Sequence, residues 1–325
     1  MLQHTPQKHQ RRRHAALAAA ILTGAVATAG LLLPGAVAVR AQDSPKPVSI
    51  ALFRGDLEQA SNVRLGSWGS GRAEKTKDFV LVGDSSILLT TAGFYQGGRL
   101  DFANPVDLSG AFANPNTYVR LRLRFNGTGS TQNQFDFNSF QTAAKAASPF
   151  ERMRFLLTMT DGASYELLRP IEVLPTDDPG GYVNVSFPVQ AIRKKNADGT
   201  PAAAPSGDGA RLQRLVIFGD KYAKFNIGEI DVITDETPIV PAPLELPPSF
   251  AEDAITFTGS AEAGASTLRY SWDFDASDGI QNEAEGRSVT HVYKKEGTYK
   301  VNLTISDVDG IKKPVTETAT LDVSK

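Results

Sequence analysis

The chain has 325 residues, of which 41% are hydrophobic and 22% charged, with no cysteine and four histidines. This is the composition of an ordinary globular protein of about two domains. Three histidines lie within residues 1–14, so His291 is the one imidazole in the rest of the chain. Without thiols, zinc sites built on Cys or His and Cys-His pairs are excluded, and a Ser-His-Asp triad would have to use His291.

The first 41 residues have the three-part pattern of a secretory signal peptide. Residues 1–14 are basic, residues 15–33 are almost entirely apolar or small, and small residues precede a cleavage site after Ala41. The adjacent arginines resemble a twin-arginine signal, but the residues after them depart from that motif, so export by Tat and export by Sec both stay open. The alternative is an uncleaved membrane anchor, because about 20 apolar residues suffice to cross a bilayer. Both alternatives place the bulk of the protein outside the cytoplasm.

Cleavage would make the chain more acidic than its full-length net charge of −2. The 34 Lys and Arg residues fall to 29, against 36 Asp and Glu, which gives a net charge of −7. A net acidic chain is not expected to bind nucleic acid through its overall field.

Residues 48–235 are expected to form antiparallel β-strands, because apolar and polar residues alternate in short runs bounded by Gly, Pro, Asn and Asp. In the run 118–125, one parity is apolar and the other carries a tyrosine and three arginines. In the run 225–233 the apolar parity changes after Ile227. A bulge near Gly228 would restore the register.

Five prolines lie within residues 236–248. Such a density favours an extended, semi-rigid conformation. We therefore expect a linker here, part of which could pair as the first edge strand of the next domain.

Short motifs follow one another through the last part of the chain. They are Phe257-Thr258-Gly259-Ser260, Tyr270-Ser271-Trp272-Asp273-Phe274, His291-Val292-Tyr293, Gly297-Thr298-Tyr299-Lys300-Val301 and Asp307-Val308-Asp309-Gly310. With these motifs, residues 240–324 resemble a PKD domain, an Ig-like β-sandwich of secreted and cell-surface proteins. The resemblance implies a binding or spacer module without chemistry of its own, in which His291 is structural.

The N-terminal unit, 48–235, carries a second set of motifs. They are Trp68-Gly69-Ser70-Gly71, Gly97-Gly98-Arg99-Leu100-Asp101-Phe102 and Phe225-Asn226-Ile227-Gly228-Glu229-Ile230-Asp231. These parts resemble the galactose-binding-like sandwiches used as carbohydrate-binding modules. The resemblance implies a jelly roll, aromatic stacking on sugar rings and a structural calcium near the first and last strands. The carboxylates available for calcium are Asp56, Glu58, Glu229 and Asp231, and ordinary solvated carboxylates are the alternative.

Aromatic residues and arginines off the apolar parity are the candidate ligand-binding residues. They are Trp68, Tyr95, Tyr118, Arg120, Arg122, Arg124, Arg152 and Arg154, and Arg99, Arg169 and Arg214 lie on other predicted strands. Trp68 is the preferred residue, because it is flanked by Gly and Ser and has little apolar company. If the arginine-bearing parities coincide, their guanidinium groups suit the carboxylates or sulfates of acidic glycans. The alternatives are packing for the aromatics and surface ion pairs for the arginines.

The sequence thus predicts an all-β protein with two tandem β-sandwiches, a jelly roll and then an Ig-like PKD sandwich, after a signal peptide. We expect a secreted or cell-surface, non-catalytic protein that binds polysaccharide or a surface glycan through its N-terminal sandwich, with the PKD unit as spacer. A structural or adhesive protein that binds other surface proteins is the alternative. A glycan hydrolase is a third, and it would need two carboxylates flanking one cleft.

Overall fold

The computed structural model describes residues 46–58, 61–125, 150–171, 181–198, 200 and 202–325. The predicted signal peptide, 1–41, lies outside these residues. Strands dominate the described chain, so the all-β prediction is confirmed. Within these residues, no helix has the length and apolar character needed to cross a membrane.

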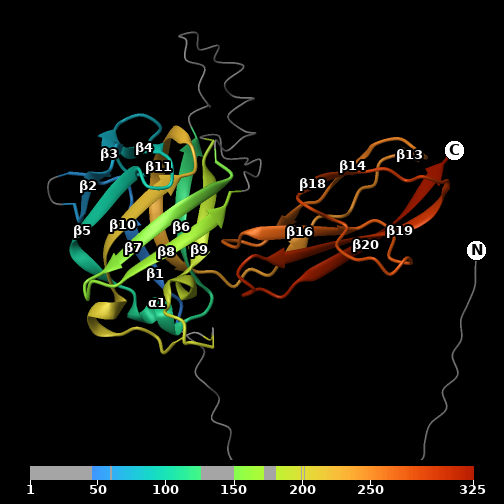
Figure 1. Ribbon diagram of the computed structural model, residues 1–325. Coiled ribbons are helices and arrows are strands. Elements are labelled where there is room, and N and C mark those ends of the chain that lie inside the picture. The colour runs from blue at the N-terminus through green and yellow to red at the C-terminus, as the bar shows by residue number, and fades with distance from the viewer. Residues whose placement is uncertain (1–45, 59–60, 126–149, 172–180, 199, 201) are drawn as a thin grey trace, which may run out of the picture. The chain divides into compact units, whose positions relative to one another are not determined.

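The N-terminal sandwich is one antiparallel sheet that folds over into two layers (Figure 1). Its strand order is β8-β7-β10-β5-β2-β3-β4-β11-β6-β9, and β1 pairs with β11. Its strands are β1 (Ser49–Phe53), β2 (Val63–Trp68), β3 (Gly71–Thr76), β4 (Ser86–Ala92), β5 (Gly97–Asp107), β6 (Thr117–Phe125), β7 (Arg152–Met159), β8 (Ser164–Pro170), β9 (Val183–Pro188), β10 (Arg211–Gly219) and β11 (Tyr222–Thr234). Short helical turns are α1 (Ser109–Ala113), η1 (Val189–Ile192) and η2 (Gly207–Ala210).

The sheet changes layer at the β2–β3 hairpin. These strands pair only at their joined ends, through Ser67 with Arg72 and Trp68 with Gly71. We call β8-β7-β10-β5-β2 the first layer and β3-β4-β11-β6-β9 the second layer. Their inner faces pack together: the ring centroids of Phe155 on β7 and Phe187 on β9 are 5.1 Å apart. Both rings are fully buried, as expected for the core of a sandwich.

The bulge predicted near Gly228 is confirmed. The pairing of β11 with β6 shifts between Ile227 and Glu229. As a result both Ile227 and Ile230 are fully buried, although they lie on opposite parities of the strand. A Cβ on Gly228 would lie 2.5 Å from Cβ of Leu81, so a side chain there would collide with the loop that covers the bulge.

The C-terminal sandwich is built on the sheet β13-β20-β19-β16-β17, with the pairs β14–β18 and β12–β15 beside it. Its strands are β12 (Val240–Pro241), β13 (Ser249–Phe250), β14 (Ile255–Thr258), β15 (Ala261–Glu262), β16 (Leu268–Asp273), β17 (Ala284–Glu285), β18 (Ser288–His291), β19 (Gly297–Asp307) and β20 (Val315–Ser324). Trp272 on β16 is fully buried and donates its indole N–H to the Gly286 carbonyl at 2.8 Å. This bond satisfies the polar atom of the largest core side chain.

Candidate functional site

The outer face of the first layer presents three rows of side chains that run across its strands. Alternate residues of β7 point into the core, which leaves Arg154, Leu156 and Thr158 on the outer face. The strand pairings then give three rows: Arg154, Phe218, Gly97 and Trp68; Leu156, Val216, Arg99 and Gly66; and Thr158, Arg214, Asp101 and Arg64.

Aromatic rings and one guanidinium fill the first row. The rings of Trp68 and Phe218 meet edge to face, with centroids 6.4 Å apart. The guanidinium carbon of Arg154 lies 4.6 Å from the Phe218 centroid and 5.1 Å from the centroid of Tyr95. Phe218 is fully buried although it points away from the core, while Tyr95 is 75% exposed. Phe218 within the row is therefore covered, whereas Tyr95, which borders the row, has a ring that is open to solvent.

Polar contacts fix Arg154 in place. It donates to the Phe94 carbonyl at 2.8 Å and to Glu166 on β8 at 3.0 Å. The hydrogen bond from Arg154 lowers the pKa of the Glu166 carboxyl, and the same bond raises the pKa of Arg154. Both groups therefore carry their charges at neutral pH, and Glu166 does not act as a proton donor there.

Asp101 of the third row forms ion pairs with two arginines, Arg214 of the same row and Arg99 of the second row. Nε of Arg214 lies 2.5 Å from one oxygen of Asp101, and Nε of Arg99 lies 2.8 Å from the other. The side chains of both arginines are about one third exposed. Two cations thus share one anion at an accessible position.

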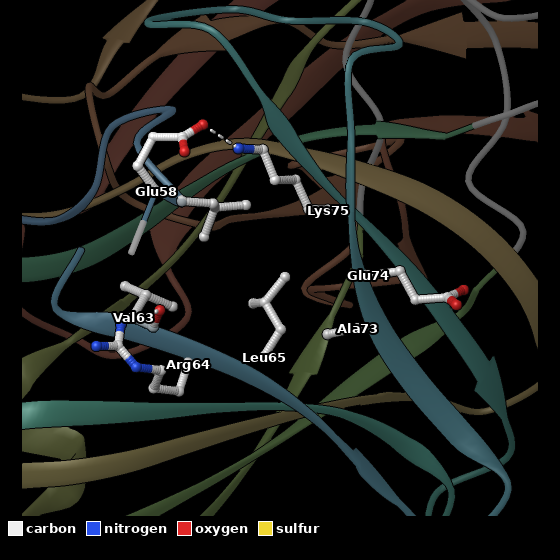
Figure 2. Close-up of a pocket in the computed structure, with 8 residues that line it drawn as sticks. Glu58, Val63, Arg64, Leu65, Ala73, Glu74 and Lys75 are labelled. Atoms are coloured by element: carbon white, nitrogen blue, oxygen red, sulfur yellow. Dashed lines mark hydrogen bonds and ion pairs between the residues drawn. The ribbon is translucent and has the colours of Figure 1, made fainter. Parts of the chain in front are cut away.

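A cavity of about 390 Å³ lies where β2 and β3 diverge, and it shares Arg64 with the third row (Figure 2). Its apolar wall consists of Leu57, Val63, Leu65 and Ala73. A charged pair closes one side, with Nζ of Lys75 2.5 Å from Glu58. Arg64 and Glu74 also line it, but none of its lining residues is aromatic, so it offers no ring on which a sugar could stack.

The structure separates the predicted arginines into two groups. Arg152 and Arg154 lie on the first layer, whereas Arg120, Arg122 and Arg124 lie on β6 of the second layer. The condition for a single guanidinium patch, that all of these arginine-bearing parities coincide on one face, is therefore not met. Parity orders residues within a strand, but the strand order decides which strands share a layer.

The second-layer arginines are engaged in structural contacts. Arg120 forms two hydrogen bonds, at 3.1 and 2.6 Å, to Asp231. Arg124 is 8% exposed, and its guanidinium carbon lies 3.5 Å from the Phe79 ring centroid. Surface pairing, the alternative considered for these arginines, describes Arg120 better than ligand binding does.

Tyr118 is not available to a ligand. It was expected on an open face with the arginines, but it is fully buried. Its hydroxyl lies 3.1 Å from the Ser266 hydroxyl, and Lys312 lies 5.6 Å from its ring centroid. These residues belong with Tyr118 to one compact unit, Ser44–Lys325. Burial raises the pKa of Tyr118 to about 12, so the phenol stays neutral.

The carboxylates suggested for calcium have other partners in the structure. Asp231 binds Arg120, Glu58 binds Lys75, and one oxygen of Asp56 accepts the backbone N–H of Glu58. A neighbouring cation already neutralises Asp231 and Glu58, and calcium needs six to eight oxygen ligands. Among the described residues, no three His, Asp or Glu side chains are grouped so that they could hold a metal ion.

His291 packs against an aromatic side chain of the C-terminal sandwich. Its imidazole stacks on Phe274, with centroids 4.1 Å apart and planes at 22°. Burial lowers its pKa, although the nearby carboxylate of Glu283 acts in the opposite direction. A stacked, half-buried imidazole matches the structural role expected from the sequence.

Residues 240–323 match the PKD domain family. The C-terminal sandwich is a PKD domain. The PKD1 domain of Vibrio anguillarum Epp is 24% identical to this chain, with 27% of this chain and 95% of that chain covered and a TM-score of 0.23.

Other solved structures match a larger share of the chain. A family 11 carbohydrate-binding module from Clostridium thermocellum, in complex with a mixed-linked tetrasaccharide, is 10% identical over 57% of this chain and 95% of that chain, with a TM-score of 0.32. The Endo-D glycoside hydrolase domain from Streptococcus pneumoniae R6 is 12% identical over 80% of this chain, with a TM-score of 0.28. This chain covers 37% of that domain. These similarities concern the fold alone, and no curated protein sequence matches the chain.

Sequence reasoning missed Phe218. It ends an apolar run and was not among the candidate residues, whereas its ring lies on the outer face beneath Trp68 and Arg154. Strict alternation along β10 could have found it, because Leu215 and Ile217 already occupy the core parity. Trp68, expected in a loop with little apolar company, ends β2 and is half-buried against Phe218.

Proposed function

We propose that this protein binds polysaccharide, without catalysis, on the outer face of the first layer. The observation that carries the proposal is the aromatic row: Phe218 and the neighbouring Tyr95 flank an arginine fixed by two hydrogen bonds, and Trp68 packs on Phe218. Aromatic rings offer flat apolar area to the apolar face of a sugar ring, and the neighbouring guanidinium groups donate hydrogen bonds to its oxygens. Strands hold Trp68 and Arg154 more firmly than loops would, and Tyr95 lies in the turn between β4 and β5.

The ion pairs on this face support a non-catalytic role. Hydrolysis of a glycosidic bond generally needs one carboxyl that gives up a proton and a second that acts as base or nucleophile. Asp101 is shared by two arginines and Glu166 is bound by Arg154. The hydrogen bond from Arg154 favours the ionised form of Glu166, so this carboxyl is not suited to donate a proton.

The location is part of the proposal. The signal-like pattern of residues 1–41 supports export by Tat or Sec, with the PKD domain as spacer or interaction module outside the cytoplasm. N-terminal sequencing of the exported protein should begin at Gln42. Recovery of the full-length chain in the membrane fraction would instead establish the uncleaved anchor.

Titration calorimetry against neutral and acidic polysaccharides tests the binding. Trp68→Ala and Tyr95→Ala should each weaken binding at least tenfold, which corresponds to about 1.4 kcal/mol. Undiminished binding by both variants would place the ligand elsewhere. Release of reducing ends from any polysaccharide would overturn the non-catalytic assignment, and binding to no glycan would favour the adhesive alternative.

A further inference from the structure

Arg99, Asp101 and Arg214 form a compact charged group beside the aromatic row. Asp101 lies directly opposite Arg214 across the β5–β10 pairing, and Arg99 lies two residues from Asp101 on the same side of β5. The carboxylate therefore lies between two guanidinium groups. Its single negative charge leaves the three residues with a net charge of +1.

Asp101 does not use the full donor set of either arginine. Arg214 donates one hydrogen bond from Nε to Asp101. Nε of Arg99 lies 2.8 Å from the other oxygen but donates no aligned hydrogen bond to it. A guanidinium carries five N–H donors, and two of them can bind the two oxygens of one oxyanion at once. Both groups are partly exposed, so a ligand can approach them.

Gly66 leaves room for the Arg99 guanidinium on the sheet. A Cβ at Gly66 would lie 3.0 Å from both Nε and Nη2 of Arg99. The guanidinium thus lies close over the β2 backbone. The backbone of Gly66 has no positive φ that would demand glycine there, so the close approach of Arg99 is what makes a small residue useful at this position.

We infer that Arg99 and Arg214 form a subsite for an oxyanion, a carboxylate or sulfate, of an acidic polysaccharide; this inference rests on the proposed function of the same face. The third row adds Arg64, which lies opposite Asp101 on β2. The arginines of this face, Arg64, Arg99, Arg152, Arg154, Arg211 and Arg214, outnumber its carboxylates Asp101, Asp107 and Glu166. A local excess of cations on an acidic chain favours an anionic ligand over a neutral one.

The spacing suits one continuous ligand. Trp68 and Gly66 are two residues apart on β2, which corresponds to about 7 Å along a strand, and Arg99 lies over Gly66. A chain whose sugar ring lies on Trp68 can therefore place an acidic group of the same or the next residue at Arg99. The aromatic row supplies stacking and the arginine pair supplies selection by charge.

Binding of matched polymers tests the inference, with the purified full chain and calorimetry at 50 mM and 500 mM NaCl. The polymers are polygalacturonate and its methyl ester, and dextran sulfate and dextran. We expect binding to one acidic polymer at least tenfold tighter than to its neutral counterpart, and a marked loss of this preference at high salt. The polymer pair that shows the preference identifies carboxylate or sulfate as the ligand group.

Arg99→Gln and Arg214→Gln should each reduce the preference, and the double variant should abolish it while the Trp68-dependent binding remains. Arg72→Gln is the matched control, because Arg72 is exposed on the second layer and pairs loosely with Glu74 at 3.5 Å; it should bind as the unmodified protein does. Thermal unfolding of each variant confirms that it is folded.

The outcomes separate the two proposals. Equal binding of acidic and neutral polymers that still depends on Trp68 would overturn the oxyanion subsite and leave the proposed function intact. A charge preference that survives in the double variant would also overturn the subsite, because the anion would then bind elsewhere. Failure to bind any of these polymers or any other polysaccharide would overturn both.

Discussion

The ring of Trp68 stands nearly perpendicular to the ring of Phe218, with an interplanar angle of 89°. This contact joins the end of β2 to β10, two strands separated by β5 in the first layer. Phe218 is completely covered on a face that would otherwise expose it to solvent. Trp68 therefore serves two purposes, since it covers Phe218 and forms part of the aromatic row.

Replacement of Trp68 should affect stability and binding together. Trp68→Ala removes an edge-to-face pair and part of the cover of Phe218, so we expect the free energy of unfolding to fall by about 1–2 kcal/mol. Urea unfolding measures this change, and calorimetry measures the loss of polysaccharide affinity. Tyr222→Ala removes a 68% exposed aromatic from the second layer and is the control. Equal loss of affinity in both variants would contradict a site on the first layer.

The Arg120–Asp231 pair should be structural. Asp231 is 1% exposed, and Arg120 binds both of its oxygens. Arg120→Met leaves a buried carboxylate without its cation, so we expect a loss of about 3 kcal/mol in the free energy of unfolding, partly recovered by adding Asp231→Leu. Polysaccharide affinity should not change. A stable Arg120→Met variant with weakened binding would restore Arg120 to the ligand site.

Gly66→Ala should act on the position of Arg99. The added Cβ displaces a flexible guanidinium rather than backbone, so the free energy of unfolding should change by less than about 1 kcal/mol. Affinity for the preferred acidic polymer should fall several-fold while affinity for its neutral counterpart stays constant. Gly110→Ala, at which a Cβ meets no atom within 4 Å, is the control. Unchanged charge preference in Gly66→Ala would show that the place of Arg99 over β2 is unimportant.

Titration of His291 should make stability depend on pH near neutrality. Burial lowers its pKa from 6.5, so the unfolded chain binds the proton more readily than the folded chain does. This contribution to stability is fully present above pH 6.5, and it is lost as the pH falls from 6.5 toward the lower pKa of the folded state. Urea unfolding between pH 5 and 8 should show this loss, and His291→Phe should remove it. The same pH dependence in the variant would assign the effect to other groups.

Much of the fold could be predicted from local pattern. Period-two alternation in 118–125 correctly separates inner from outer side chains, and the change of parity after Ile227 locates the bulge at Gly228. The PKD motifs were sufficient to identify the C-terminal domain. These features depend on neighbouring residues in one strand or on a complete set of local motifs, and both are visible in the sequence.

Only the tertiary structure decided which outer side chains meet. In the first layer β10 lies between β5 and β7, although more than a hundred residues separate β5 from β10 in the chain. Alternation gives the face of each residue within its own strand but contains no record of strand order, so it could not separate Arg120 from Arg154 or bring Arg99 to Arg214. The sequence by itself determined two β-sandwiches and the side chains that they could display. Long-range pairing of strands determined the charged and aromatic face, because neighbours across a sheet are set by backbone hydrogen bonds between segments far apart in the chain.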